Sequence, residues 1–184
     1  MQTKKKTSQL KNQENKAFSH WDEKGETKMV DVGGKKTTSR LARARAILKP
    51  SALFPKNWEE SFSKGNPWPK GNPWEVAKIA GMQAAKKTST LIPLCHPLAL
   101  NHIELKMHWK ENQNLFFLEC TVKTEAKTGA EMEALVGVSI AALTFYDMIK
   151  AVDPFCTVQT LGVYKKTGGK SGKWMNPALE WGDF

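Results

Sequence analysis

Residues 128–152 read TGAEMEALVGVSIAALTFYDMIKAV, and this segment fixes the helical part of the predicted fold. Between Ala134 and Ile149 almost every side chain is small or apolar, over a length that suits a helix better than a strand. Thr128, followed three residues later by Glu131, matches a capping box. We therefore predict one long apolar helix that begins at this box and runs to about Val152.

Strands and a second helix are expected on either side of this segment. Asn72 can cap a helix that has Pro73 in its first turn, is supported by Glu75, and continues to about Leu91. Residues 111–114 suit a hairpin turn. Alternating or β-rich patterns predict strands at residues 37–48, 102–109, 115–127 and 157–165. The order strand, helix, strand, strand, helix, strand is a split βαβ, so the predicted fold class is α+β and ferredoxin-like, with two main helices packed on an antiparallel sheet.

Composition is ordinary for a soluble globular protein, with 40% hydrophobic and 25% charged residues in a chain of 184. No apolar run approaches the roughly 20 residues that span a bilayer, and the N-terminus does not resemble a secretory signal. Cys95, Cys120 and Cys156 lie far apart and are odd in number, which predicts reduced thiols in the cytoplasm. The net charge of +10 favours an anionic partner, which could be nucleic acid, a membrane surface or a phosphorylated small molecule.

The stretch LIPLCHPL, residues 91–98, places a thiol and an imidazole side by side between two prolines. Pro93 and Pro97 stiffen the backbone, so His96 is expected to point in one defined direction. A pre-oriented imidazole indicates a binding or catalytic site, although a histidine that only hydrogen-bonds in the core would have the same local sequence. A Cys95–His96 nucleophilic pair is disfavoured, because adjacent residues of an extended segment rarely direct their side chains at each other.

Acidic groups occupy both ends of the predicted long helix. Asp147 and Lys150 are spaced i, i+3 and share one face, as a functional pair or as a simple ion pair. Glu131 and Glu133 lie at the other end, where Glu131 could be only the acid of the capping box. Fourteen residues separate Glu133 from Asp147, which is about 21 Å of helix. If both groups contact one substrate, the simplest arrangement is a site between two subunits.

Lysines make up the third group of candidate residues. Lys70 precedes the start of a helix, where backbone N–H groups favour anions. Lys166, Lys170 and Lys173 alternate with glycines after the last strand, in a loop that could close over a phosphate chain. For Lys173 a solvated lysine-rich tail is the better interpretation.

Several motifs, in order, resemble those of the MoaC family, the cyclic pyranopterin monophosphate synthases of molybdenum cofactor biosynthesis. They are MVDV at 29–32, IAGMQAAK at 79–86, LIPLCHPL at 91–98, TGAEMEAL at 128–135, FYDMIKAV at 145–152 and KTGGKSG at 166–172. The resemblance covers residues 18–174, which predicts a catalytic domain there. Residues 1–17 have almost nothing to bury and are expected to form a disordered lysine-rich tail, and residues 175–184 are expected to form a C-terminal tail.

The same resemblance implies an activity. It is the conversion of 3′,8-cyclo-7,8-dihydro-GTP to cyclic pyranopterin monophosphate and diphosphate, by a lyase of the phosphorus–oxygen type. It also implies a cytoplasmic homohexamer built as a trimer of dimers, with active sites at dimer interfaces. An upstream radical enzyme of the same pathway would supply the substrate. No organic cofactor, metal, nucleic acid or membrane is expected to take part.

By resemblance, the catalytic residues are Asp147, Lys70, Lys150 and Lys166. Asp147 is assigned to proton transfer, and the lysines to acid catalysis or to stabilisation of the phosphate or leaving group. The residues expected to bind the substrate are Leu94, Cys95, His96, Glu131, Met132, Glu133, Lys35, Arg40 and Lys170. Among these, His96 and Glu133 are expected to orient the base, and Lys35 with Arg40 to add contacts to the triphosphate.

Three features depart from the family pattern. Asn72 stands where the family usually has aspartate, and Lys78 where arginine is common. The sequence KGNPW occurs twice, so Lys64 competes with Lys70 for the same role; only the copy with Lys70 abuts the predicted helix.

The rival hypothesis is a basic RNA-binding module on the same kind of sheet, but the predicted strand LFFL lacks the basic-Gly-aromatic lead of such proteins.

Overall fold

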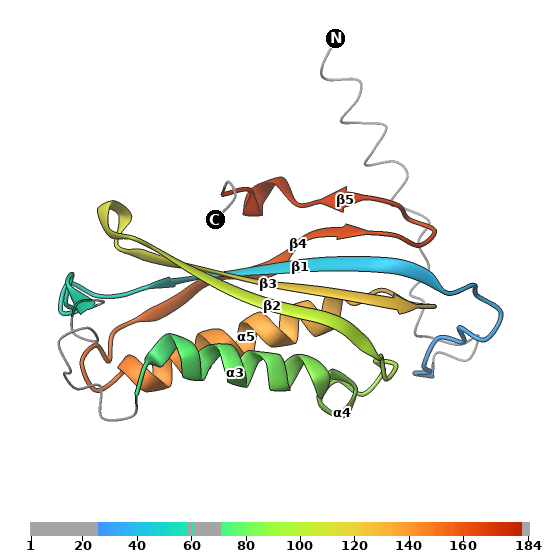
Figure 1. The fold of residues 1–184 in the computed structure, drawn as a ribbon, viewed down its shortest axis with the longest axis horizontal. Helices are drawn as coiled ribbons and strands as arrows, with labels where there is room; N and C mark the ends of the chain where they lie inside the picture. Colours follow the sequence, from blue (N-terminus) through green and yellow to red (C-terminus); the bar gives the residue numbers. More distant parts are fainter. Residues whose placement is uncertain (1–25, 59, 61–70, 182–184) are drawn as a thin grey trace, which may run out of the picture.

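The computed structural model describes residues 26–58, 60 and 71–181 of the chain. Within them, one antiparallel sheet carries helices on one face, as Figure 1 shows. In sheet order the strands are β2 (Leu100–Lys110), β3 (Leu115–Ala126), β1 (Thr38–Lys49), β4 (Thr157–Thr167) and β5 (Trp174–Met175). The helices are α3 (Pro73–Lys86), the short α4 (Thr88–Leu91) and α5 (Glu131–Ile149), with 3-10 turns at Glu111–Gln113 and Pro177–Leu179.

The α+β prediction is confirmed, because the order β2-β3-β1-β4 with helices after β1 and β3 is the split βαβ arrangement. The predicted hairpin turn is present as well. There Asn114 has a φ of 51°, in the left-handed region that asparagine tolerates, and its side-chain amide donates to the carbonyl oxygen of Pro50 at 3.0 Å. The β5 strand was not expected from the sequence.

The core lies between the sheet and the two long helices. Strand β1 turns Ala42, Ala44 and Ala46 toward the helices, and all three are fully buried. Alternate side chains of a strand point to opposite faces, so Arg45 projects from the other side of the sheet. Small residues on β1 leave room for α5 to approach the sheet closely.

Glycine sets how closely α3 approaches α5. A Cβ at Gly81 of α3 would lie 2.6 Å from the carbonyl oxygen of Gly137 on α5. The two backbones are thus in contact at this point. By length and composition alone α5 is long and apolar enough to cross a membrane, which was not expected from the sequence. The structure explains its apolar character, because α5 packs against the sheet and α3 as the core helix (Figure 1).

The start of α3 agrees with prediction, and its end does not. At α3 the Asn72 side chain caps as expected, accepting hydrogen bonds from the N–H groups of Trp74 and Glu75 at 2.9 and 3.3 Å. The α3 helix ends earlier than predicted, at Lys86, and α4 continues the path to Leu91.

The predicted capping box of α5 is wrong. The N-cap position belongs to Ala130, with no side-chain cap, and the helix begins at Glu131. The Glu131 carboxylate instead accepts a hydrogen bond from Lys166 of β4, at 2.7 Å. The carboxylate of Glu131 therefore bonds to a lysine of a distant strand and not to the backbone N–H groups at the start of its own helix.

The described part of the C-terminal segment, residues 174–181, packs against the sheet. Arg45, fully buried, pairs with Glu119 at 2.7 Å and donates to the carbonyl oxygen of Leu179 at 2.7 Å. Its guanidinium also lies over the ring of Tyr164, 3.6 Å from the centroid. Trp181 packs against Phe117 with ring centroids 5.0 Å apart. The segment therefore covers part of the sheet face that the helices leave open, as its position in Figure 1 illustrates.

Candidate active site

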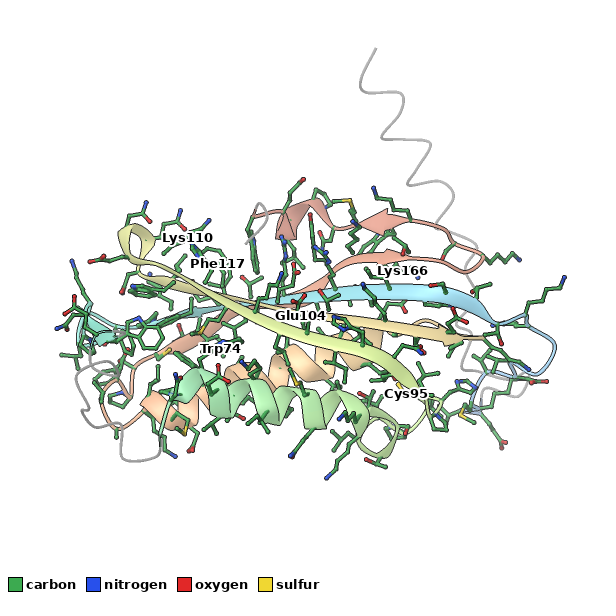
Figure 2. All side chains as sticks on the ribbon, in the orientation of Figure 1. Trp74, Cys95, Glu104, Lys110, Phe117 and Lys166 are labelled. Carbon is green, nitrogen blue, oxygen red and sulfur yellow. The ribbon has the colours of Figure 1, made fainter. Side chains whose placement is uncertain are left out.

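A cavity of about 370 Å³ opens where the loop after α4 meets the first turn of α5. Cys95 marks this loop, and it lies at the same end of the molecule as Lys166 of β4 (Figure 2). Many of the residues selected from sequence converge here, although they come from three separate segments of the chain. Those that line the cavity are Lys35, Leu94, Cys95, His96, Glu131, Met132 and Glu133.

Glu133 is the buried acid of this cavity. Its side chain belongs to the first turn of α5 and is only 4% exposed. Burial raises the pKa of its carboxyl to about 7, and the nearby charge of Glu131 adds to this effect. A carboxyl group with such a pKa can hold or release a proton near neutral pH.

The surroundings of Cys95 do not activate its thiol as a nucleophile. Burial and the neighbouring Glu133 both raise the pKa of its thiol. The thiol therefore stays protonated at neutral pH, whereas a nucleophilic cysteine needs a lowered pKa. This argues further against a Cys95–His96 nucleophilic enzyme and leaves Cys95 as a wall of the cavity.

Lys166 and Glu131 form an ion pair beside this cavity, with 2.7 Å between Nζ and Oε1. Both side chains are about three-quarters buried. Gly129 leaves room for the Glu131 carboxylate in this position, because a Cβ at residue 129 would overlap it. The pair also belongs to a second cavity, of about 480 Å³, so Glu131 lines both.

Arg40 and Lys170 line neither cavity. The Arg40 guanidinium donates to the carbonyl oxygens of Ala126 and Lys127 at 3.2 and 3.1 Å, and so holds the chain where β3 ends. It packs against Gly169, whose φ of 70° suits glycine. Lys170 is exposed on the same glycine-rich loop.

Asp147 and Lys150 lie at the far end of α5, and this chain does not bring them to the cavity. Their charged groups are 2.7 Å apart, and both side chains are about half exposed. The hydrogen bond with Asp147 is the main reason why the pKa of Lys150 is raised. Because α5 is continuous, about 21 Å of helix separates Asp147 from Glu133. The remaining predicted catalytic residue, Lys70, lies outside the described residues, as does its competitor Lys64.

Two contributors to this region were missed in the sequence. Lys127 donates from Nζ to the carbonyl oxygen of Gly33 at 2.7 Å, which ties the segment carrying Lys35 to the end of β3. Trp174 lines the second cavity. For Trp174 the available signal was a large aromatic residue directly after the glycine-rich lysine loop. Among the described residues, no group of three or more His, Cys, Asp or Glu side chains could hold a metal ion.

Comparison with known proteins decides the family. The model of the MoaC family matches residues 29–169, most of the chain. The chain belongs to the MoaC family. Among the similar MoaC-family proteins, one from Lysinibacillus sphaericus (strain C3-41) is 46% identical over 158 residues, covering 84% of this chain and 95% of the relative.

Relatives from other bacteria agree. A protein of Parvibaculum lavamentivorans is 46% identical over 161 residues, covering 86% of this chain and 96% of its own. One from Thermomicrobium roseum is 43% identical over 159 residues, covering 85% and 92%. All three are named cyclic pyranopterin monophosphate synthase. The resemblance to MoaC proteins inferred from the motifs is thereby confirmed.

Proposed function

We propose that this MoaC-family chain is a cyclic pyranopterin monophosphate synthase. It converts 3′,8-cyclo-7,8-dihydro-GTP to cyclic pyranopterin monophosphate with release of diphosphate, as a lyase of the phosphorus–oxygen type. The observation that carries the proposal is the cavity at the start of α5, which gathers a buried acid, an imidazole and a lysine in a chain of this family.

The reaction sets two chemical demands. Rearrangement of the purine-derived rings needs groups that exchange protons near neutral pH, and the Glu133 carboxyl, with its pKa of about 7, is suited to this or to orienting the base beside His96. Release of diphosphate requires a hydroxyl oxygen of the substrate to attack the α-phosphorus, which closes the cyclic phosphate as the bond to diphosphate breaks. The hydroxyl gives up its proton, and negative charge is left on the departing diphosphate. Ammonium groups stabilise such charge, a role that we assign to Lys166 together with Lys70 and Lys150.

A second copy of the chain completes the proposed site. Asp147 is the assigned proton-transfer group, yet it lies about 21 Å along α5 from Glu133. A homo-oligomer in which the Asp147 end of one chain meets the cavity of another would supply both. A hexamer arranged as a trimer of dimers would satisfy this requirement, with Lys35, Arg40 and Lys170 available near the triphosphate.

The rival RNA-binding function has little support in the structure. Single-stranded RNA is bound on sheets of this type by exposed aromatic side chains that stack with bases. Phe116 and Phe117 of β3 are 0% and 4% exposed, so neither offers a free ring. The burial of these two rings favours the enzyme over the RNA-binding module. For the enzyme we propose a cytoplasmic location and an upstream radical enzyme of the same pathway as the source of its substrate.

The test is direct. The purified protein is incubated with 3′,8-cyclo-7,8-dihydro-GTP, and both diphosphate and the pterin product are quantified. The Asp147→Asn variant is the matched control: it should fold and assemble normally but lose turnover by about 10²–10⁴-fold, the usual contribution of a general acid or base. Absence of diphosphate release by the wild type would refute the function, and full turnover by Asp147→Asn would remove Asp147 from the mechanism.

A further inference from the structure

The second cavity extends the region of the active site toward the C-terminal segment. Its volume is about 480 Å³, and it shares Glu131 with the first cavity. Its other lining residues come from β4 and the segment that follows, namely Val163, Lys166, Ser171, Lys173 and Trp174. Three of them lie beyond residues 29–169, the part of the chain that matches the family model. This wall therefore extends beyond the part of the chain that the family model matches.

Trp174 lies beside the Lys166–Glu131 ion pair. Strand β5 pairs Trp174 directly with Lys166 of β4. Residues directly opposite each other in an antiparallel pair project to the same face, with Cβ atoms about 5 Å apart. Because Lys166 reaches Glu131 of α5, that face is the side of the sheet that carries the helices. The indole and the ion pair consequently border the same space.

The backbone around Trp174 is fixed by contacts that do not involve its indole. The N–H group of Asn176 donates to the carbonyl oxygen of Tyr164 at 2.8 Å, and Arg45 holds the carbonyl oxygen of Leu179. Trp181 anchors the end of the segment against Phe117. Trp174 itself keeps 45% of its surface exposed. A large ring that projects from a fixed backbone at the wall of a cavity, and is left half open to solvent, is placed to receive a flat ligand.

We infer that the indole of Trp174 stacks against the fused ring system of the substrate, with the carboxylate of Glu131, which lines both cavities, at the edge of those rings. This inference rests on the proposed function. The base derived from GTP has flat faces that can stack on an aromatic side chain, and N–H donors along its edge that a carboxylate can accept. Trp174 is thus a residue for binding and specificity, which contributes equally in the ground state and the transition state.

Steady-state kinetics provide the first test. Stacking on an aromatic side chain is worth enough that Trp174→Ala should raise KM about tenfold, equivalent to ~1.4 kcal/mol, with kcat nearly unchanged. Trp174→Phe should recover most of the lost affinity, because a phenyl ring still stacks. Leu161→Ala is the matched control: Leu161 is an equally exposed apolar residue of β4, at 48%, and lines neither cavity, so its loss should leave KM as in the wild type.

Direct binding separates the contact with the rings from contacts with phosphate. In calorimetry, Trp174→Ala should weaken the binding of GTP, which carries both purine and triphosphate, about tenfold. It should leave the binding of inorganic triphosphate unchanged. Unaltered affinity for GTP, equal losses for both ligands, or no binding of GTP to the wild type would each overturn the inference. A wild type that binds GTP through Trp174 but releases no diphosphate would instead refute the proposed function alone.

Discussion

Two inactive variants of this protein should restore each other's activity. Asp147→Asn and Glu133→Gln change opposite ends of α5, which is continuous from Glu131 to Ile149. Because about 21 Å of helix separates the two positions, they cannot act on one small substrate within one chain. Each variant alone is expected to lose turnover by about 10²-fold or more. In a mixed pair, however, one site contains both wild-type residues and the other contains both substitutions.

The size of the recovery follows from the symmetry of the assembly. If the two variants are produced in equal amounts and pair at random, about half of the dimers are mixed, and each mixed dimer has one intact site of two. Co-expression should therefore return about a quarter of the wild-type diphosphate release per chain.

The assay needs two differently tagged chains, purified through both tags in sequence so that only mixed assemblies remain. Native mass spectrometry confirms that both variants are present. In these assemblies activity should exceed that of either variant alone by well over an order of magnitude. No recovery in verified mixed assemblies, or full activity in a wild-type monomer, would refute the reasoning that two chains share each site.

Two further predictions concern pH and packing. Burial raises the pKa of Glu133 from 4.5 to about 7, so between these values the folded chain holds a proton that the unfolded chain has lost, and stability falls as pH rises through this window. Glu133→Gln does not titrate, so its melting temperature should decline less than that of the wild type between about pH 5 and 8, and an equal decline would contradict the assignment. Gly81→Ala should lower the free energy of unfolding by about 1–3 kcal/mol in urea titrations, because its Cβ would lie 2.6 Å from the carbonyl oxygen of Gly137. In Gly34→Ala no atom lies within 4 Å of the added Cβ, so the free energy of unfolding should change by less than about 0.5 kcal/mol. If the two variants lost the same free energy of unfolding, the close contact between α3 and α5 would not be the cause of the loss in Gly81→Ala.

Much of the fold follows from local pattern. The alternation in residues 37–48 identifies β1, and the apolar stretch after Glu131 identifies α5, because burial on one face or in the core imposes those periods on the sequence. The cap at Asn72 is equally local, since its side chain bonds to backbone N–H groups two and three residues away. Such features need no knowledge of the rest of the chain.

Features that depend on distant partners were not predictable in the same way. Glu131 has the sequence position of a capping acid, but its carboxylate is taken by Lys166, 35 residues away. Residues 175–181 have the composition of a tail, but they pack on the sheet, where Arg45 and Tyr164 provide hydrogen-bond partners for their backbone. The cavity was predictable in part. Its motifs can be recognised in the sequence, but which of their residues line one cavity is known only from the fold.

The unbroken length of α5 has a consequence for gene dosage. If the two ends of this helix belong to different active sites, every chain contributes to two active sites. A chain that is defective at both ends then inactivates both active sites of the dimer that it forms with a normal chain. In a cell that carries one normal and one doubly altered copy of the gene, randomly mixed pairs would then be inert, so the harm would exceed the loss of half the protein. Such an allele would behave as dominant-negative, whereas damage confined to one end would leave about half of the active sites intact, no worse than the loss of half the protein.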